Sequence, residues 1–239
     1  MSNNFRREAA VRALRQPGKT LGLMFSRRGW SRMKYAIRPP AHGALVSDGP
    51  LAVRGYPRYD DYLAHQRGKL ATLDLKAYYR EFRAGLAARL DGGGWAGKSV
   101  LCLAARIGSE VRAFHDVGAF AVGIDINPGK DNPVVLPGDF HALVFPDNSV
   151  DAVYSNSLDH ALDLGRMIGE IRRVLKPGGL LLVDAQQGAE IAEFDDWAAT
   201  SWASIDVLAE TIAANGVDLM ERTPITVPWS GELLLFTKP

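Results

Sequence analysis

Short apolar runs alternate with amphipathic segments through the second half of the chain. The first run, residues 100–104, is typical of a buried strand, and after a brief turn a helix-like segment follows over residues 109–117. A second run, residues 119–124, ends on Asp125. In a parallel sheet, a strand-turn-helix-strand unit places the turn and the acid side by side at the carboxyl edge, where ligands bind. The pattern therefore predicts an α/β fold with a ligand site at this unit.

The same unit indicates which kind of ligand to expect. Backbone N–H groups of a turn and a helix start can bind an anionic or polar group, and a carboxylate that ends a strand suits a ribose diol. The unit thus predicts a nucleoside-containing cofactor. A dinucleotide fold needs G-x-G-x-x-G for close approach to a pyrophosphate, whereas residues 104–108 read AARIG with one glycine. The turn by itself is weak support for NAD.

The pattern predicts further elements on both sides of this unit. Leucines, alanines and aromatics recur at helical spacing from Tyr59 to Leu90, which predicts one or two amphipathic helices. Residues 16–57 are rich in Gly, Pro and Arg and are expected to be mostly loop, with an apolar turn at 21–25. Downstream we expect strands over residues 133–136, 152–155, 180–185, 217–222 and 232–237, and helices over residues 164–175 and 204–215.

Composition agrees with a globular protein. The chain has 239 residues, of which 47% are hydrophobic and 23% charged, enough for one α/β domain with an extension. No apolar run reaches the length of a membrane-spanning helix. The one cysteine, Cys102, lies inside the first apolar run, which predicts a buried apolar role, excludes a disulfide framework and favours a reduced, cytoplasmic setting.

Charge is distributed unevenly along the chain. The net charge is +1, yet residues 1–40 carry ten basic residues against Glu8 alone. Residues 5–14 have the pattern of a short, weakly amphipathic basic helix, and a transit peptide is an alternative. Such a basic segment suits an anionic surface, either nucleic acid or lipid headgroups. The alternative is that its arginines pair with the acidic remainder of the chain.

A second acid follows the short strand predicted over residues 133–136. Residues 138–156 read GDFHALVFPDNSVDAVYSN. The carboxylate of Asp139 can accept a hydrogen bond from the exocyclic amine of adenine, and the apolar side chains of Phe140 and Leu143 can flank the ring. A pyrophosphate-binding protein has no special need of this acid. Residues 170–184, EIRRVLKPGGLLLVD, then lead from a helix into the fifth strand.

These motifs resemble those of the class I S-adenosylmethionine-dependent methyltransferases, with a type 11-like domain. The first family motif is an acid, then G-x-G-x-G, then a helix. Aligned in this way, Cys102 stands at the acid, Ala104 and Arg106 at the first two glycines, and Gly108 at the third. The Gly-Asp-Phe run, the K-P-G-G run and the two closing strands match later regions of the family. The resemblance covers residues 98–238 and implies S-adenosylmethionine as the cofactor.

The resemblance also implies a fold and a division of the chain. The implied fold is a Rossmann-like, doubly wound sheet of seven strands in the order 3-2-1-4-5-7-6, with the last strand antiparallel and an N-terminal helical extension. Residues 1–57 are then a basic, partly irregular arm, residues 58–94 a helical cover, and residues 95–239 the cofactor-binding domain.

Site residues follow from the family at matching positions. Asp125 is expected to bind the ribose and Asp139 the adenine, while the turn contacts the methionine part through its backbone. Glu110 is the nearest carboxylate that can compensate for the acid absent at Cys102, or it is simply a favourable charge at a helix N-terminus. The expected cofactor-binding residues are Ala104, Ala105, Arg106, Gly108, Glu110, Asp125, Ile126, Asp139, Phe140 and Asn156.

The candidate for proton transfer is His160, which follows the fourth strand and adjoins Asp159. A neutral imidazole can accept a proton near pH 7, as transfer of a methyl group to a hydroxyl requires. The alternative is that His160 caps or packs under the loop. The spacing of His141, Asp159 and Asp163 does not support a metal site, and none is expected.

The leading hypothesis is a methyltransferase that acts on a hydroxyl or carboxyl group of a small molecule, lipid or glycan. The N/D-P-P-Y/F string of amino-methylating DNA enzymes does not occur in the sequence. Two alternatives remain open: a cofactor-binding or interaction protein that has lost catalysis, and an RNA methyltransferase, which the basic arm suggests. A cytoplasmic location is expected, with peripheral association at an anionic membrane as an option.

Overall fold

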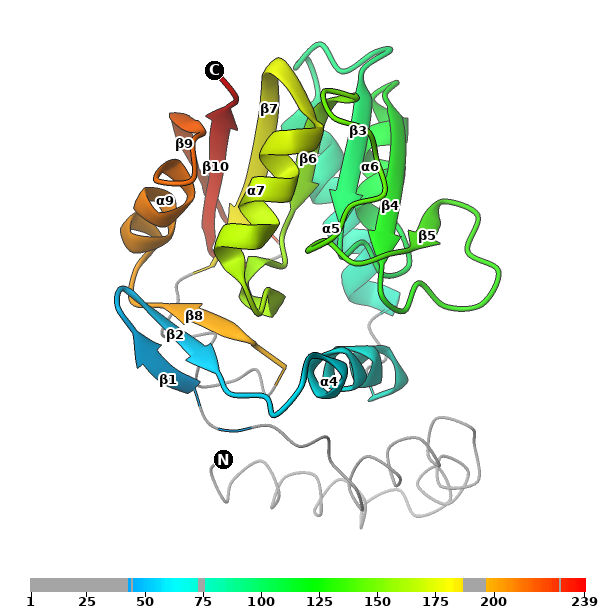
Figure 1. Cartoon of the computed structure of the whole chain (residues 1–239). Coiled ribbons are helices and arrows are strands. Elements are labelled where there is room, and N and C mark those ends of the chain that lie inside the picture. Colours follow the sequence, from blue (N-terminus) through cyan, green and yellow to red (C-terminus); the bar gives the residue numbers. More distant parts are fainter. Residues whose placement is uncertain (1–42, 44, 73–75, 187–196, 228) are drawn as a thin grey trace. The chain divides into compact units, whose positions relative to one another are not determined.

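The computed structural model describes residues 43, 45–72, 76–186, 197–227 and 229–239 (Figure 1). The chain falls into two compact units, of which the smaller contributes residues 56–72 to the described part and the larger contributes the rest. The helix predicted over residues 5–14 and the apolar turn over residues 21–25 lie outside the described residues.

A seven-stranded sheet forms the centre of the larger unit (Figure 1). Its strands are β3 (Ser99–Leu103), β4 (Phe120–Asp125), β5 (Val135–Pro137), β6 (Val150–Ser155), β7 (Leu175–Ala185), β9 (Asp218–Ile225) and β10 (Gly231–Thr237). They lie in the order β5-β4-β3-β6-β7-β10-β9. Neighbours pair in parallel, except that β10 is antiparallel to both β7 and β9. Numbered within this sheet, the order is 3-2-1-4-5-7-6 with the last strand antiparallel, which confirms the predicted fold.

Helices cover both faces of the sheet, and this explains why β3 is apolar throughout. Val100 and Cys102 pack toward α5 (Lys76–Leu90) and α6 (Ser109–Asp116). Leu101 and Leu103 belong to the opposite core, with α7 (Leu164–Val174) and α9 (Ile205–Ala213). Successive side chains of a strand point to opposite faces, so a strand between two helical layers needs no polar positions. Cys102 is fully buried, as predicted.

The described part of the N-terminal half contains a hairpin that the sequence does not predict. Residues 16–57 are expected to be mostly loop, yet β1 (Leu45–Asp48) and β2 (Leu51–Arg54) form an antiparallel hairpin. The hairpin pairs with β8 (Thr200–Trp202) in a second, three-stranded sheet. The Arg54 side chain also donates from Nε to the Ala198 carbonyl at 2.7 Å. These strands are short, and a partner about 150 positions away stabilises them, so no local pattern reveals them.

The smaller unit contains α4 (Tyr59–Thr72), so the one or two helices predicted from Tyr59 to Leu90 are two, α4 and α5. Tyr62 and His65 are buried, while Tyr59 is 40% exposed. The Tyr56 hydroxyl lies 2.8 Å from His65 Nδ1. Tyr62 is therefore a core residue, as its helical spacing predicts. Within the described part of the chain, none of the helices has the length and apolar character needed to cross a membrane.

Candidate cofactor site

The turn after β3 meets the end of β4 at the carboxyl edge of the sheet. The Asp125 carboxylate accepts a hydrogen bond from the Arg106 backbone N–H at 3.0 Å through Oδ2. Its Oδ1 accepts from the Asn127 N–H at 2.7 Å. One carboxylate thus positions both the turn and the loop after β4, and each of its oxygens has a second lone pair for a hydroxyl donor.

Every second residue of the turn has a positive φ angle: 52° at Ala104, 43° at Arg106 and 84° at Gly108. Only glycine adopts this left-handed conformation without strain. At Gly108 space is restricted as well, because a Cβ would lie 2.6 Å from a methyl group of Val134. These are the three glycine positions of the family motif. The turn therefore keeps a glycine-type backbone although two of the glycines are replaced.

Arg106 connects the turn to two further segments. Its guanidinium Nη1 lies 3.3 Å from the hydroxyl of Tyr79 on α5. Its carbonyl accepts a hydrogen bond from Nδ2 of Asn132 at 3.1 Å. A half-buried arginine thus stands where the family has a glycine, with its cationic group near the α5 side of the turn.

Glu110 lies in the first turn of α6 and is only 6% exposed. Burial raises the pKa of its carboxyl to about 7. The charges of Asp125 and Asp184 act in the same direction, whereas its own backbone N–H and the charge of Arg106 oppose them. Within the described ranges, no lysine or arginine nitrogen lies at ion-pair distance from Glu110. Glu110 is therefore the acidic residue at the N-terminus of α6 that the sequence allows, and it is buried.

Cys102 occupies the position of the family's acid in β3. Burial, together with the negative charge of Glu110, raises the pKa of the thiol well above its ordinary value. The thiol stays neutral and cannot substitute for a carboxylate. Because Glu110 acts on Cys102 electrostatically, it is a carboxylate near the position where the family's acid would lie.

The Gly-Asp-Phe run follows β5 and lies beside Asp125. The Gly138 N–H donates to the backbone carbonyl of Asp125 at 3.0 Å. The Asp139 side chain is 26% exposed, and its Oδ1 accepts from the His141 N–H at 2.8 Å. Phe140 is 7% exposed and belongs to the core between the sheet and α7. Two predicted cofactor acids thus reach one edge of the sheet, and the Phe140 ring is mostly packed into the core.

Past β6, the chain forms the short 3-10 helix η1 (Leu158–His160), which contains the candidate base. His160 is 7% exposed. Its Nδ1 lies 3.2 Å from the Trp197 carbonyl, which can only accept, so Nδ1 carries the proton of the neutral ring. Nε2 lies 3.6 Å from the Asp159 carboxylate. Asn156, at the start of this loop, accepts from the Ser157 hydroxyl at 2.9 Å.

His141 is engaged through both ring nitrogens. Its Nδ1 lies 3.1 Å from Asp139, and its Nε2 accepts from the Asp163 N–H at 3.2 Å. In the part of the chain that the structure describes, no group of three or more His, Cys, Asp or Glu residues is arranged to hold a metal ion. His141 therefore braces the Asp139 loop.

One polar cluster near this edge is absent from the sequence predictions. Asp184, in β7, is buried and forms an ion pair with Arg89 of α5. The Tyr154 hydroxyl donates to the same carboxylate at 2.7 Å. Burial raises the pKa of Asp184, although Arg89 and Tyr154 oppose this. The acid that ends the apolar run LLLVD is the sequence feature that could have indicated this cluster.

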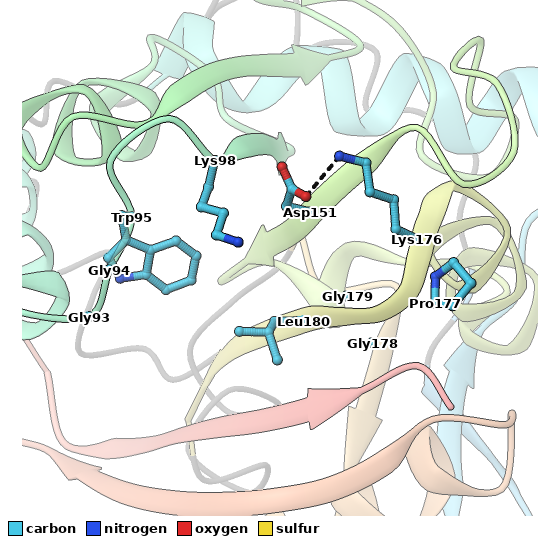
Figure 2. A pocket seen from close by; sticks show the side chains of 10 residues that line it. All are labelled: Gly93, Gly94, Trp95, Lys98, Asp151, Lys176, Pro177, Gly178, Gly179 and Leu180. Carbon is cyan, nitrogen blue, oxygen red and sulfur yellow. Dashed lines mark hydrogen bonds and ion pairs between the residues drawn. The ribbon is translucent and has the colours of Figure 1, made fainter.

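A cavity of about 270 Å³ lies at the opposite, amino edge of the sheet (Figure 2). Trp95, Lys98, Asp151 and Lys176 contribute side chains to it. Asp151 accepts hydrogen bonds from the Ser99 hydroxyl at 2.7 Å and from Lys176 Nζ at 2.8 Å, which lowers the pKa of its carboxyl. Asp151 thus joins the starts of three neighbouring strands, far along the strands from the predicted cofactor residues.

Sequence comparison agrees with this geometry. Residues 101–183 match the methyltransferase domain family. This stretch, from β3 to β7, is therefore the part of the chain that resembles the family. The chain is 32% identical over 169 residues to a sterol 24-C-methyltransferase of Gibberella zeae, which covers 70% of this chain and 40% of that protein. It is also 32% identical over 161 residues to the 2-methyl-6-phytyl-1,4-hydroquinone methyltransferase of Synechocystis sp., covering 56% and 50%. The chain thus spans half or less of the length of these relatives.

Structural comparison supports the same fold for this methyltransferase domain. The 1,6-didemethyltoxoflavin-N1-methyltransferase of Burkholderia thailandensis superposes with a TM-score of 0.60 and 14% identity, over 82% of this chain and 99% of that one. That structure holds S-adenosylhomocysteine. For the present chain, the family match and the sequence motifs both indicate S-adenosylmethionine as the cofactor. The residues fit such a group, because the turn keeps its glycine-type backbone and the buried Glu110 carboxylate has no ion-pair partner among the described residues.

Proposed function

We propose that this chain is an S-adenosylmethionine-dependent methyltransferase for a small molecule or lipid. The observation that carries the proposal is the β3-turn-α6-β4 unit, where Asp125 binds the turn through the Arg106 N–H. The positive φ angles at the three glycine positions support it, and so does the family match over residues 101–183. Residues 95–239 are the proposed cofactor-binding domain, residues 58–94 its helical cover and residues 1–57 a basic arm.

The cofactor contacts that we propose follow the chain's own geometry. The free lone pairs of Asp125 accept from the two ribose hydroxyls, and Asp139, on the adjacent loop, accepts from the adenine amine. The turn and the first residues of the neighbouring loops, Ile126 and Asn156 included, surround the remainder. When bound, S-adenosylmethionine supplies a methyl group on a sulfonium sulfur, whose thioether is the leaving group.

For the acceptor we propose an apolar molecule that carries a hydroxyl group. The two relatives described above are named for carbon 24 of a sterol and for a phytyl hydroquinone; both molecules are largely apolar, and the hydroquinone supports the hydroxyl group of the proposed acceptor. Removal of the hydroxyl proton makes the oxygen, and in a hydroquinone the ring carbon beside it, a nucleophile for the methyl group. Alignment of this nucleophile with the methyl carbon is the main catalytic requirement.

His160 is the proposed base for that proton. Because its Nδ1 faces the Trp197 carbonyl and carries the proton of the neutral ring, Nε2 is the nitrogen that we propose takes the substrate's proton. The Asp159 carboxylate, 3.6 Å from Nε2, stabilises the imidazolium that results. β3 and β6 are adjacent parallel strands. The cofactor turn follows the end of β3, and Asp159 and His160 lie in the loop that follows the end of β6.

Calorimetric titration with S-adenosylmethionine and S-adenosylhomocysteine is the first test. We expect binding of both below about a millimolar, the weak end of cofactor sites. Transfer of labelled methyl groups to sterols, hydroquinones, fatty acids and RNA then identifies the acceptor class. Absence of binding would overturn the proposal. Binding without transfer to any acceptor favours the catalytically lapsed protein, which the replaced glycines of the turn also suggest, and transfer to RNA alone favours the nucleic-acid alternative.

A further inference from the structure

Two side chains around Gly108 carry opposite charges in places where the family motif has neither. Arg106 replaces the second glycine of the turn, and Glu110 lies four residues later in the first turn of α6. The charge of Arg106 acts on Glu110 electrostatically. The turn that approaches the cofactor therefore contains one cation and one carboxylate of its own.

The backbone at Arg106 indicates that its side chain has a use. Its φ of 43° lies in the left-handed region, where a non-glycine residue is strained and glycine is not. Such strain is found mainly at functional sites. The guanidinium near the Tyr79 hydroxyl, at 3.3 Å, lies at the α5 side of the turn. A long cationic side chain is thus kept where a glycine would fit with less strain.

The burial of Glu110 indicates a cationic ligand. The residue is 6% exposed and, within the described ranges, lacks an ion-pair partner. A buried carboxylate becomes favourable in its charged form only when a cation or several hydrogen-bond donors match it. The family's own acid position, Cys102, holds a neutral, fully buried thiol. The Glu110 carboxylate can therefore neutralise the charge of a cationic group that binds next to the turn.

We propose that Arg106 and Glu110 together bind the amino-acid end of S-adenosylmethionine. Arg106 pairs with the ligand's carboxylate, and Glu110 pairs with its ammonium group, in place of the acid missing at Cys102. Guanidinium-carboxylate and carboxylate-ammonium contacts are charge-assisted hydrogen bonds, the strong kind. This inference rests on the proposed function, because it assigns two residues of the same site to one end of the cofactor.

The test uses two pairs of ligands, and the members of each pair differ only at this end. Decarboxylated S-adenosylmethionine lacks the carboxylate and keeps the ammonium and the sulfonium, and 5′-methylthioadenosine lacks the amino-acid end of S-adenosylhomocysteine altogether. Dissociation constants for all four ligands are measured by calorimetry on the full chain and on the Arg106→Gly and Glu110→Gln variants. Arg83→Gln is the matched control, since it removes an arginine charge from a partly exposed ion pair with Asp116 and leaves the turn unaltered.

We expect Arg106→Gly to bind S-adenosylmethionine and S-adenosylhomocysteine about tenfold to a hundredfold more weakly, with little change for the two ligands without a carboxylate. Glu110→Gln should weaken every ligand that has the ammonium group, by a similar factor, and spare methylthioadenosine. Arg83→Gln should leave all four constants unchanged. Thermal melting monitored by circular dichroism checks that each variant is folded.

The possible failures are distinguishable. If the unaltered protein binds S-adenosylhomocysteine but the variants bind it equally well, the ion-pair assignment is overturned and the proposed function stands. If Arg106→Gly weakens methylthioadenosine as much as S-adenosylhomocysteine, Arg106 acts on the nucleoside or the turn, and the assignment is again overturned. If the unaltered protein binds none of the four ligands, both proposals are overturned.

Discussion

At the scale of single residues, Asp125 holds the turn with one carboxylate oxygen and the next loop with the other. We expect Asp125→Asn to weaken cofactor binding by about 1.5–3 kcal/mol, because an amide loses the charge and one acceptor. Titration calorimetry measures this effect. Asp131→Asn, the same change on an exposed neighbouring residue, serves as control and should bind normally. Unchanged affinity in Asp125→Asn would remove the ribose contact from the proposal.

His160 can be tested separately from cofactor binding. If it is the base, His160→Ala should lower turnover by about 10² to 10⁴ and leave the cofactor dissociation constant nearly unchanged. His115→Ala, at an exposed position of α6, is the control and should keep full activity. Initial rates and calorimetry on the same preparations give both quantities. Loss of rate and affinity together, or of neither, would mean a structural histidine.

The raised pKa of the buried Glu110 carboxyl should make the free energy of unfolding depend on pH. This pKa is about 7 in the folded protein against 4.5 for an ordinary glutamate, so the folded state retains the proton longer. Stability should therefore fall as pH rises from about 4.5 to 7, by on the order of 2–3 kcal/mol in total. The charged and titratable groups that face Glu110 are Cys102, Arg106, Asp125, Tyr154 and Asp184.

Glu110→Gln lacks this titration, so its stability relative to the unaltered protein should be greater at pH 8 than at pH 5. Urea unfolding at the two pH values measures the difference. Equal differences at both values would contradict the raised pKa.

At the scale of elements, the Asp184 cluster joins β6, β7 and α5 beneath the helix layer. Arg89→Met leaves a buried carboxylate without its cation, and we expect a loss of about 3–5 kcal/mol in the free energy of unfolding. Tyr154→Phe removes one hydrogen bond and should cost about 1–2 kcal/mol. Arg83→Met, on the same helix, removes a partly exposed ion pair with Asp116 and should cost less than about 1 kcal/mol. Similar losses for both arginine variants in urea unfolding would contradict the assigned burial effect.

At the scale of the whole molecule, basic and acidic residues are distributed unevenly along the chain. Ten of the 28 basic residues fall in residues 1–40, and the rest of the chain is acidic. We propose that this arm holds the protein reversibly at an anionic membrane surface, where apolar acceptors are concentrated. Each basic residue near such a surface contributes about 1 kcal/mol.

The arm is tested in the full chain by replacing Arg6, Arg7, Arg12 and Arg15 with Gln. The unaltered protein should sediment with anionic vesicles at low salt, and the variant should lose most of this binding. Vesicles of neutral lipid are the control and should bind neither protein. Binding to RNA without binding to vesicles would redirect the search for the acceptor, and binding to neither would mean that the arginines pair with the acidic body.

The sequence by itself determined the seven strands of the central sheet, and the resemblance to the methyltransferase family supplied their order. Apolar runs flanked by turns and amphipathic helices are local patterns, and they predicted the seven strands of the central sheet and the helices between them, but not β8. The acid at the end of β4 was also predictable, since strand ends in a parallel sheet meet at one edge. Asp125 and the turn were therefore expected together, and they are joined through the Arg106 N–H.

Only the tertiary structure decided the features that depend on distant partners and on loss of water. The β1-β2 hairpin pairs with β8, far along the chain, and short strands have no local signal strong enough to predict this. The left-handed backbone at Ala104 and Arg106 runs against the preference of both residues, so their residue types do not predict it. Glu110 and Asp184 are charged residues whose burial no periodicity reports, because desolvation depends on every element packed around them. Patterns along the chain predict which elements form, and the contacts between elements decide which charges those elements enclose.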